Sequence, residues 1–344
     1  MDEKQKKRLM WQLPFLTLLV VGTVLIIRQQ QAIPYQKNAD FIFGTSYHIT
    51  YQCDSDMASE IKAELLKVDQ SLSPFNEKSI ITAVNQNKAV QLDSMFLDVY
   101  NLAEQISEET DGAFDITVAP LVNAWGFGFK NSTMPSPYQV DSLRQIVGYQ
   151  KVSLENGRIK KKDPRIMLDC SAIAKGYGCD VVAKFLRSRG IKNFMVEIGG
   201  EIVTSGLNPD RLPWKVGVTK PSEDSLSTSH ELQTILNVTD MAMATSGNYR
   251  NFYYKDGKRY AHTIDPRTGR PVQHNILSAT VLAPSCAMAD AYATSFMVMG
   301  LKEAQQILAQ HPELMAYLIY TDEKGNYAIW QSEGMKTADD AENN

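Results

Sequence analysis

Leu168-Asp169-Cys170-Ser171-Ala172-Ile173-Ala174-Lys175-Gly176 is the stretch of this sequence that decides the fold and the site. It follows Arg165-Ile166-Met167, which is typical of a short apolar strand, and it runs into 177–186, which is typical of a helix. The stretch is therefore expected where a strand passes into a helix. The first N–H groups of a helix lack partners within the helix, and the helix dipole favours an anion there.

Asp169 and Lys175 flank this junction, and only small residues and Ile173 lie between them. Small side chains allow a ligand to come close to the backbone. The pattern therefore predicts an anion-binding site. The alternative is a plain capped junction with a solvated lysine, since short motifs are weak signals when taken alone.

The composition is that of a globular protein, with 344 residues, 44% of them hydrophobic and 22% charged. The net charge of −4 argues against a nucleic-acid partner, which would require a basic face. An anionic ligand would have to be attracted locally, by a helix terminus, a lysine or a metal. The four cysteines have neither metal-type nor disulfide-framework spacing, and they are Cys53, Cys170, Cys179 and Cys286.

The N-terminus differs from the rest of the chain. The basic stretch 4–8 precedes the apolar run Leu9–Ile27, which would span about 28 Å as a helix, close to the thickness of a bilayer core. Residues 1–31 are therefore predicted to form an uncleaved transmembrane anchor with its basic end in the cytoplasm. A cleaved signal peptide is the alternative, but no small-x-small site follows Ile27.

Residues 32–335 are predicted to form one compact extracytoplasmic domain, with two lobes as a variant, and 336–344 a disordered acidic tail. The predicted strands and helices are interspersed without a regular βαβ alternation. This order favours a mixed α+β fold with mostly antiparallel sheets and packed helices. A strand is expected over 41–51 and a hairpin turned at Asp256-Gly257. The main helices are expected over 57–72, 99–110, 136–147, 285–299 and 301–310.

The helix expected over 285–299 contains Asp290 among alanine and methionine, so this carboxylate should be buried. A buried carboxylate is normally paired or bound to a metal. Thr294 lies four residues on, on the same face, and this pair suits a hard cation such as Mg²⁺. The alternative is that Asp290 pairs with an arginine and Thr294 bonds back to its own helix.

His262 lies near the end of a strand, just before a turn rich in Pro, Thr and Gly. Its pKa range suits a general base, although a lone histidine is more often structural. The stretches 112–117 and 123–128 are rich in glycine and aromatic residues. They could line a slot for a flat ring, and core packing explains the aromatics equally well.

Taken together and in order, these stretches resemble the ApbE family of FAD:protein FMN transferases. The resemblance covers roughly residues 41 to 320. The matching blocks are Phe43-Gly-Thr-Ser, Leu72-Ser-Pro-Phe75, 112–128, 168–176, Glu197-Ile-Gly-Gly-Glu201, Ala244-Thr-Ser-Gly247, 262–269 and Ala289-Asp290 to Thr294.

The resemblance implies an ApbE-like, T-fold-related domain in an extracytoplasmic bacterial enzyme that binds FAD and Mg²⁺. Such enzymes cleave the FAD pyrophosphate, pass FMN to a threonine of a target protein and release AMP. The implied targets are subunits of membrane redox complexes of the Rnf or Na⁺-translocating NADH:quinone reductase type. The implied location is the bacterial inner membrane, with a single span and the catalytic domain facing the periplasm.

Matching residue by residue, the resemblance implies that Asp290, the Thr294 hydroxyl and the Ala172 carbonyl ligate Mg²⁺. Asp290 and His262 are the implied catalytic residues, with His262 as the base that deprotonates the acceptor threonine. The implied contacts to FAD come from Phe43, Phe75, Ala113, Phe114, Asp115, Asp169, Lys175 and Ile264.

The chain departs from the family pattern at several positions. Phe43 replaces a usual methionine, Phe75 a frequent tyrosine, and both Glu201 and Asn248 a common aspartate. Most relatives are lipoproteins, whereas an anchor is expected here. Two other functions fit the same residues: a Mg²⁺-dependent FAD pyrophosphatase that gives FMN and AMP, and a non-catalytic periplasmic FAD-binding protein.

Overall fold

A computed structural model describes residues 3–127, 134–220, 232–248, 252–255, 258–273 and 275–335. Its centre is an eight-stranded sheet with the order β1-β2-β5-β6-β9-β14-β15-β16, and each neighbouring pair is antiparallel. The predicted mixed α+β, mostly antiparallel fold is confirmed. The strands are β1 (Tyr35–Ile42), β2 (Thr45–Gln52), β5 (Phe194–Ile198), β6 (Glu201–Ser205), β9 (Ala242–Gly247), β14 (Ile276–Ala283), β15 (Met315–Thr321) and β16 (Tyr327–Gln331).

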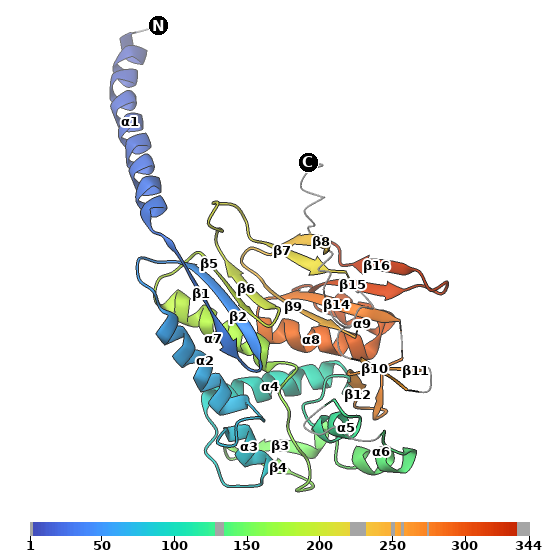
Figure 1. Ribbon diagram of the computed structural model, residues 1–344. Coiled ribbons are helices and arrows are strands. Elements are labelled where there is room, and N and C mark those ends of the chain that lie inside the picture. Colours follow the sequence, from blue (N-terminus) through green and yellow to red (C-terminus); the bar gives the residue numbers. More distant parts are fainter. Residues whose placement is uncertain are drawn as a thin grey trace.

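Helices cover one face of this sheet and a β-hairpin covers the other (Figure 1). The helices are α1 (Glu3–Ala32), α2 (Ala58–Leu72), α3 (Ile80–Asn85), α4 (Ser94–Glu109), α5 (Ala119–Ala124), α6 (Pro137–Arg144), α7 (Ala174–Ser188), α8 (Cys286–Met299) and α9 (Leu301–Gln310). The short strand pairs are β3 (Val152–Glu155) with β4 (Arg158–Lys161), β7 (Lys215–Thr219) with β8 (Leu232–Asn237), β10 (Phe252–Lys255) with β11 (Lys258–Ala261), and β12 (Ile264–Asp265) with β13 (Arg270–Pro271). Helices α7 and α8 lie under the sheet, and β7–β8 lies above it.

The sheet consists of two halves that follow the order of the chain. Strands β1, β2, β5 and β6 form the N-terminal half-sheet, and β9, β14, β15 and β16 form the C-terminal half-sheet. In the described chain the halves pair only at Ile202 with Met243 and at Val203 with Ala242. β9 then continues to Gly247 along β14, while β6 begins at Glu201. The two halves therefore part beyond this short seam.

The prediction of one strand over 41–51 is wrong, because this segment contains the turn of a hairpin. Ile42 pairs with Thr45, so Phe43 and Gly44 form a two-residue loop. Both residues have positive φ, +52° and +74°, as a type I′ turn requires. An aromatic residue is unusual at such a turn position, so the alternating pattern of the sequence concealed the break.

The strand predicted just before the stretch 168–176 is also absent from the described structure. Residues 166–168 belong to no strand, and the Asn85 side chain takes the place of a neighbouring strand. Its amide nitrogen donates to the Leu168 carbonyl at 2.9 Å, and its oxygen accepts from the Leu168 N–H at 2.7 Å. Helix α7 begins at Ala174 rather than at 177, so Lys175 and Gly176 lie in its first turn.

Several local predictions are confirmed. The helix predicted over 285–299 is α8, whose first turn is capped by the Ser285 hydroxyl accepting from the Met288 N–H at 3.3 Å. The helix over 301–310 is α9. β10 and β11 pair antiparallel with Lys255 opposite Lys258, as the predicted hairpin requires, while its turn residues 256–257 lie outside the described residues.

Helix α1 extends away from the sheet domain (Figure 1). Within the described residues, no helix combines the length and the apolar character needed to cross a membrane, so the predicted transmembrane anchor is not supported. The apolar run of α1 is interrupted by Gln12, Pro14, Thr17, Gly22 and Thr23. The predicted domain limits stay predictions, and the tail 336–344 lies outside the described residues.

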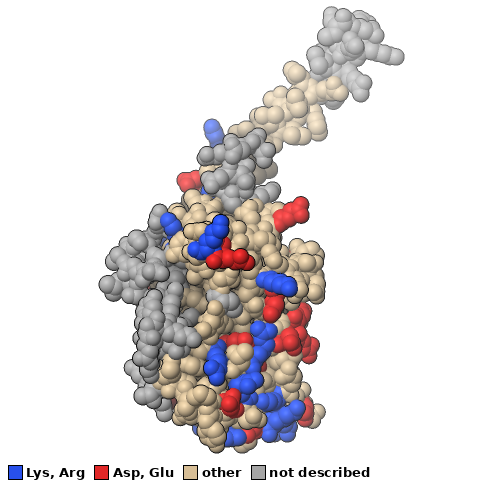
Figure 2. Space-filling model, turned by 90° about the vertical axis from the view of Figure 1, so that its right-hand side faces the viewer, with Lys and Arg blue, Asp and Glu red and all other residues tan. Residues whose placement is uncertain are grey.

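The surface mixes charges of both signs. On the face shown in Figure 2, Lys and Arg side chains lie among Asp and Glu side chains. Ion pairs in the described part of the chain include Arg165 with Asp163 at 2.7 Å and Lys67 with Glu64 at 2.7 Å. Such exposed pairs contribute little to stability.

Candidate active site

A cavity of about 700 Å³ opens where the two half-sheets part. Its wall includes Glu201 and Ile202 at the start of β6, the 245–247 end of β9, and residues of β7 and α8. Among the predicted site residues, those that line the cavity are Phe75, Ala113, Phe114, Asp115, Asp169, Ala172, Lys175, His262, Ile264, Asp290 and Thr294. Positions far apart in the sequence are thus brought into one cavity.

Of the two phenylalanines predicted to contact FAD, Phe75 lines the cavity and Phe43 does not. Phe75 is 72% exposed and lies at the mouth of the cavity. Phe43 is not among the lining residues, and its ring packs on α7, where a Cβ built on Gly178 would lie 2.7 Å from it. The position of Phe43 therefore does not support a direct contact with FAD.

Helices α7 and α8 cap each other with carboxylates. Asp180 of α7 accepts from the Cys286 N–H at 2.8 Å and from the Ala287 N–H at 2.9 Å, at the start of α8. Asp290 of α8 accepts from the Gly176 N–H at 3.2 Å, in the first turn of α7. Each carboxylate satisfies N–H groups that a helix leaves unpaired and interacts favourably with the helix dipole.

Gly176 permits this close crossing of the two helices. A Cβ built on Gly176 would lie 2.3 Å from the Cys286 carbonyl oxygen and 2.9 Å from the Ala287 nitrogen. These are backbone atoms, so they cannot turn away as a side chain could. The glycine in the opening stretch therefore places the start of α7 directly against the start of α8.

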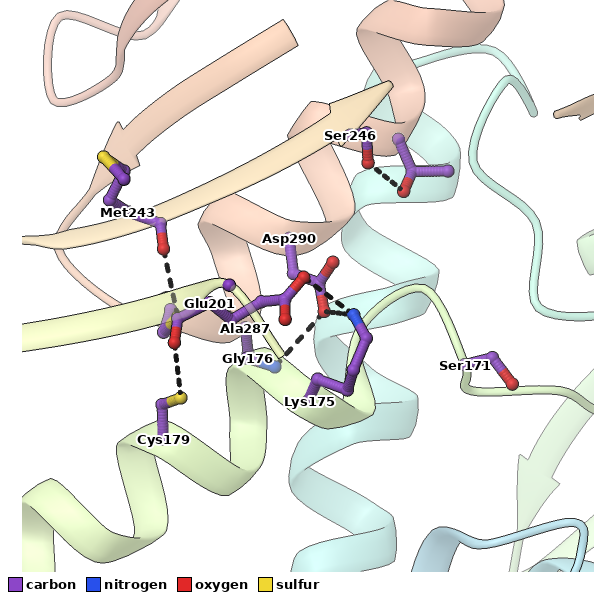
Figure 3. Close-up of polar contacts among 12 residues, drawn as sticks. Ser171, Lys175, Gly176, Cys179, Glu201, Met243, Ser246, Ala287 and Asp290 are labelled. Atoms are coloured by element: carbon purple, nitrogen blue, oxygen red, sulfur yellow. Dashed lines mark hydrogen bonds and ion pairs between the residues drawn. The ribbon is translucent and has the colours of Figure 1, made fainter. Parts of the chain in front are cut away.

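Lys175 lies between two buried carboxylates (Figure 3). Its ammonium donates to Glu201 Oε1 at 2.7 Å and lies 3.8 Å from Asp290 Oδ2. The ion-pair partner of Asp290 is thus Lys175, and the alternative pairing with an arginine is wrong. Glu201 Oε2 is buried and has no hydrogen-bond partner in the described chain.

The three groups shift one another's pKa values. Burial raises the pKa of Asp290 and of Glu201, and the Lys175 ammonium acts against this rise in both. Burial alone would lower the pKa of Lys175, but the Asp290 and Glu201 carboxylates together raise it above its ordinary value. Lys175 therefore stays charged and gives the cavity a local cation despite the negative net charge of the chain.

Asp290, Thr294 and Ala172 supply oxygen donors of the kind that Mg²⁺ prefers. All three line the cavity, and the Thr294 hydroxyl lies 3.2 Å from the Ser246 hydroxyl of β9. Thr294 thus faces β9 rather than only its own helix. In the described residues, no three His, Cys, Asp or Glu side chains gather as a metal cluster. A carboxylate, a hydroxyl and a carbonyl nevertheless fit a hard cation.

Asp115 and Asp169 organise the loops at the cavity wall. Asp115 Oδ1 accepts from the Thr117 N–H at 2.7 Å, and its Oδ2 accepts from the Tyr149 N–H at 2.8 Å. Asp169 Oδ1 accepts from the Ser171 N–H at 2.8 Å. Both oxygens of Asp115 are thus engaged within the protein, so this residue is suited to shaping the 113–117 loop.

His262 lines the cavity at half-buried position, and its ring lies edge-on to Phe127 with centroids 6.4 Å apart. The loop that follows it is fixed by Trp125, whose indole N–H donates to the Gly269 carbonyl at 2.8 Å. Trp125 is buried in a cluster with Leu121, Val140 and Ile264. Of the two predicted roles for these aromatic residues, Trp125 therefore serves core packing, whereas Phe127 lines the cavity.

Comparison with known proteins identifies the family of this chain. The ApbE family model matches residues 43–319, which is most of the chain. The chain belongs to the ApbE family. The resemblance predicted from the ordered blocks of this ApbE-family chain is thereby confirmed.

Individual relatives of this ApbE-family chain match along most of their length. A FAD:protein FMN transferase of Vibrio cholerae is 38% identical over 291 residues, covering 81% of this chain and 86% of the relative. The solved structure of the flavin transferase ApbE from Vibrio cholerae superimposes with a TM-score of 0.79 at 35% identity, covering 88% of this chain and 98% of that one. The apo flavinyl transferase ApbE of Pseudomonas stutzeri gives 0.78 at 28% identity, covering 88% and 95%.

The sequence did not assign a role to Glu201, which the structure places beside Lys175. The available signal was the block Glu197-Ile-Gly-Gly-Glu201, in which a Gly-Gly turn directs the residue that follows it. The role of Asp180 was also missed. An aspartate in the second turn of a helix gives no sign that it caps a second helix more than a hundred residues away.

Behind the cavity wall, burial raises the pKa of Glu104 from 4.5 to about 7, and the carboxylates of Asp115 and Glu108 add to the rise. As the pH rises, Glu104 therefore ionises in the unfolded chain before it ionises in the folded protein. This difference should lower the free energy of unfolding between pH 4.5 and about 7. Glu104→Gln should raise the free energy of unfolding by about 1 kcal/mol above this window, a value discounted for partial exposure, and change it little below pH 4.

Urea unfolding at several pH values measures this effect. Glu77→Gln is the control, because it removes an exposed carboxylate that is not one of the groups raising the pKa of Glu104. A Glu104→Gln variant whose unfolding free energy keeps the wild-type pH dependence would show that Glu104 ionises normally in the folded protein.

Proposed function

We propose that this chain is an enzyme, a Mg²⁺-dependent FAD:protein FMN transferase that attaches FMN by a phosphoester bond to a threonine of a target protein. The observation that carries the proposal is the cavity at the seam, where Lys175, Asp290, Thr294 and His262 line one space. Family membership and relatives named FAD:protein FMN transferase support the same activity.

The transfer exchanges one P–O bond for another. The threonine oxygen bonds to the FMN phosphorus, the bond from that phosphorus to the bridging oxygen breaks, and AMP leaves with the bridging oxygen. His262 accepts the hydroxyl proton, since its pKa range suits a general base. The Lys175 ammonium faces the phosphate groups and offsets their negative charge.

Asp290, the Thr294 hydroxyl and the Ala172 carbonyl are the residues that would hold Mg²⁺. When bound, the ion neutralises charge on the phosphate oxygens. The loop residues Ala113 and Phe114, together with Asp169 and Ile264, border the space left for FAD. Phe75 is exposed at the mouth of this space. Asp115 shapes the 113–117 loop through its hydrogen bonds to the Thr117 and Tyr149 N–H groups.

The proposal is tested by incubating the purified chain with FAD, Mg²⁺ and an acceptor domain that contains a candidate threonine. Transfer predicts AMP release together with flavin fluorescence on the acceptor band of a denaturing gel. AMP release with a non-fluorescent acceptor would instead favour hydrolysis of FAD to FMN and AMP. Absence of AMP over many equivalents of FAD would favour an FAD-binding protein without turnover.

His262→Ala should abolish transfer and leave FAD binding within about threefold, because general-base catalysis typically contributes 10²–10⁴-fold to the rate. The rate is measured by acceptor fluorescence and the binding by quenching of flavin emission. His311→Ala is the control for loss of a histidine that does not line the cavity, since His311 lies beside Glu109 and Glu313. A His262→Ala variant that loses FAD affinity would mark His262 as a binding residue instead.

We also propose that the acceptors are subunits of membrane redox complexes of the Rnf or Na⁺-translocating NADH:quinone reductase type. We further propose that the catalytic domain lies on the periplasmic side of the inner membrane. The basic stretch 4–8 before an apolar run, an order found in export signals, supports this location. A reporter fused after residue 335 that is active only in the periplasm tests the location.

A further inference from the structure

The Lys175 ammonium is shared unequally between its two carboxylates. It lies 2.7 Å from Glu201 and 3.8 Å from Asp290. Of these, the first is a hydrogen-bonded ion pair and the second is too long for a direct hydrogen bond. The Asp290 side chain is almost fully buried, and the Lys175 ammonium lies near its carboxylate without being hydrogen-bonded to it.

The β5–β6 hairpin holds Glu201 in this position. Gly199 and Gly200 form its turn with φ of +63° and +104°, a region that favours glycine. Glu197 Oε1 accepts from the Gly200 N–H at 2.7 Å, and a Cβ on Gly199 would lie 2.8 Å from Thr45. The turn is thus fixed on both sides, and Glu201 enters the cavity from a rigid support.

The Glu201 carboxylate keeps the Lys175 ammonium from forming a close ion pair with Asp290. If Glu201 did not take the ammonium, the nearest buried anion for Lys175 would be Asp290. A tight Lys175–Asp290 pair would occupy the carboxylate that the proposed function gives to the metal. An ammonium drawn onto Asp290 would repel a divalent cation at the same carboxylate, so the two cations would compete for it.

We propose that Glu201 is a positioning residue that holds the Lys175 ammonium away from Asp290 and so keeps the Asp290 carboxylate available to a divalent cation. This inference rests on the proposed function in one respect, the assignment of Asp290 as a cation ligand. Glu201 itself touches neither the acceptor nor the reacting phosphorus in this proposal.

The test measures cation binding without FAD, on the full-length chain, with Mn²⁺ followed by electron paramagnetic resonance. Glu201→Gln keeps the shape of the side chain and removes its charge. It should weaken Mn²⁺ binding by about 10–100-fold, the range found when a residue that orients a metal ligand is lost. Thermal unfolding of each variant confirms that the chain is folded.

A double variant separates positioning from folding. Glu201→Gln combined with Lys175→Met should restore Mn²⁺ affinity to within about threefold of wild type, because no ammonium is left to occupy Asp290. Glu197→Gln is the matched control for charge, since it removes one carboxylate from the same hairpin and cavity wall. It leaves the Lys175–Glu201 pair intact and should change Mn²⁺ affinity by less than about threefold.

The outcomes are distinct. Wild-type Mn²⁺ affinity in Glu201→Gln would overturn the inference while leaving the proposed function standing. An equal loss in Glu197→Gln, or no recovery in the double variant, would show that Glu201 acts through its charge alone and would also overturn it. Unchanged Mn²⁺ binding in Asp290→Asn would overturn the metal assignment of the proposed function, and this inference with it.

Discussion

Asp290→Asn is expected to lower the rate of FMN transfer by about a thousandfold or more and to remove its dependence on Mg²⁺. A metal ion contributes several kcal/mol of charge stabilisation in phosphoryl transfer, and each 1.36 kcal/mol is about tenfold in rate. The asparagine oxygen can still accept from the Gly176 N–H, so the contact that now measures 3.2 Å is preserved. The loss should therefore appear in the rate and not in the fold.

The measurement is the transfer rate as a function of Mg²⁺ concentration, with thermal unfolding alongside. Asp180→Asn is the matched control, because Asp180 is the other carboxylate of the reciprocal cap and bonds only to the start of α8 in the contacts given above. It should lower stability modestly and keep the Mg²⁺ dependence. An Asp290→Asn variant with full activity would exclude Asp290 as a metal ligand.

Gly176→Ala is expected to destabilise the protein by more than the 1–3 kcal/mol typical of overpacking, or to prevent folding altogether. The added methyl group would lie 2.3 Å from the Cys286 carbonyl oxygen. Relief requires α7 and α8 to move apart, which would break the reciprocal caps and separate Lys175 from Asp290. Urea unfolding and the yield of folded protein measure the effect.

Gly178→Ala is the control on the same helix. There the added methyl group would lie 2.7 Å from the Phe43 ring, a side chain that can shift. The cost should be small, because alanine is about 1 kcal/mol more favourable than glycine within a helix. If both substitutions cost the same, the backbone contact at Gly176 would not be what holds the two helices in place.

The sequence was sufficient where local chemistry sets the structure. Helix α8 was predicted from Ser285 to Met299 because its cap and its apolar run are both local signals. Asp290 and Thr294 were expected on one face because helical spacing places residues four apart together. The ordered blocks then added the family, which the comparisons confirm.

The sequence was insufficient where distant segments replace a local element. Asn85 substitutes for a strand beside Leu168, and nothing near 168 indicates that partner. Phe43 occupies a left-handed turn position because its ring packs on α7, a tertiary contact that overrides the local preference. The importance of Glu201 depends on Lys175, which a different element supplies.

The division of the sheet has a consequence for how the protein is made. Lys175 and Glu201 come with the N-terminal half-sheet, whereas Asp290 and Thr294 come with α8 in the C-terminal half. Chains are synthesised from the N-terminus, and early segments can begin to fold before later ones exist. A nascent or truncated chain that ends before α8 thus possesses the lysine and its glutamate without the aspartate they serve. Under the proposed function, such a chain lacks two of the three residues that would hold Mg²⁺, because Asp290 and Thr294 lie in α8.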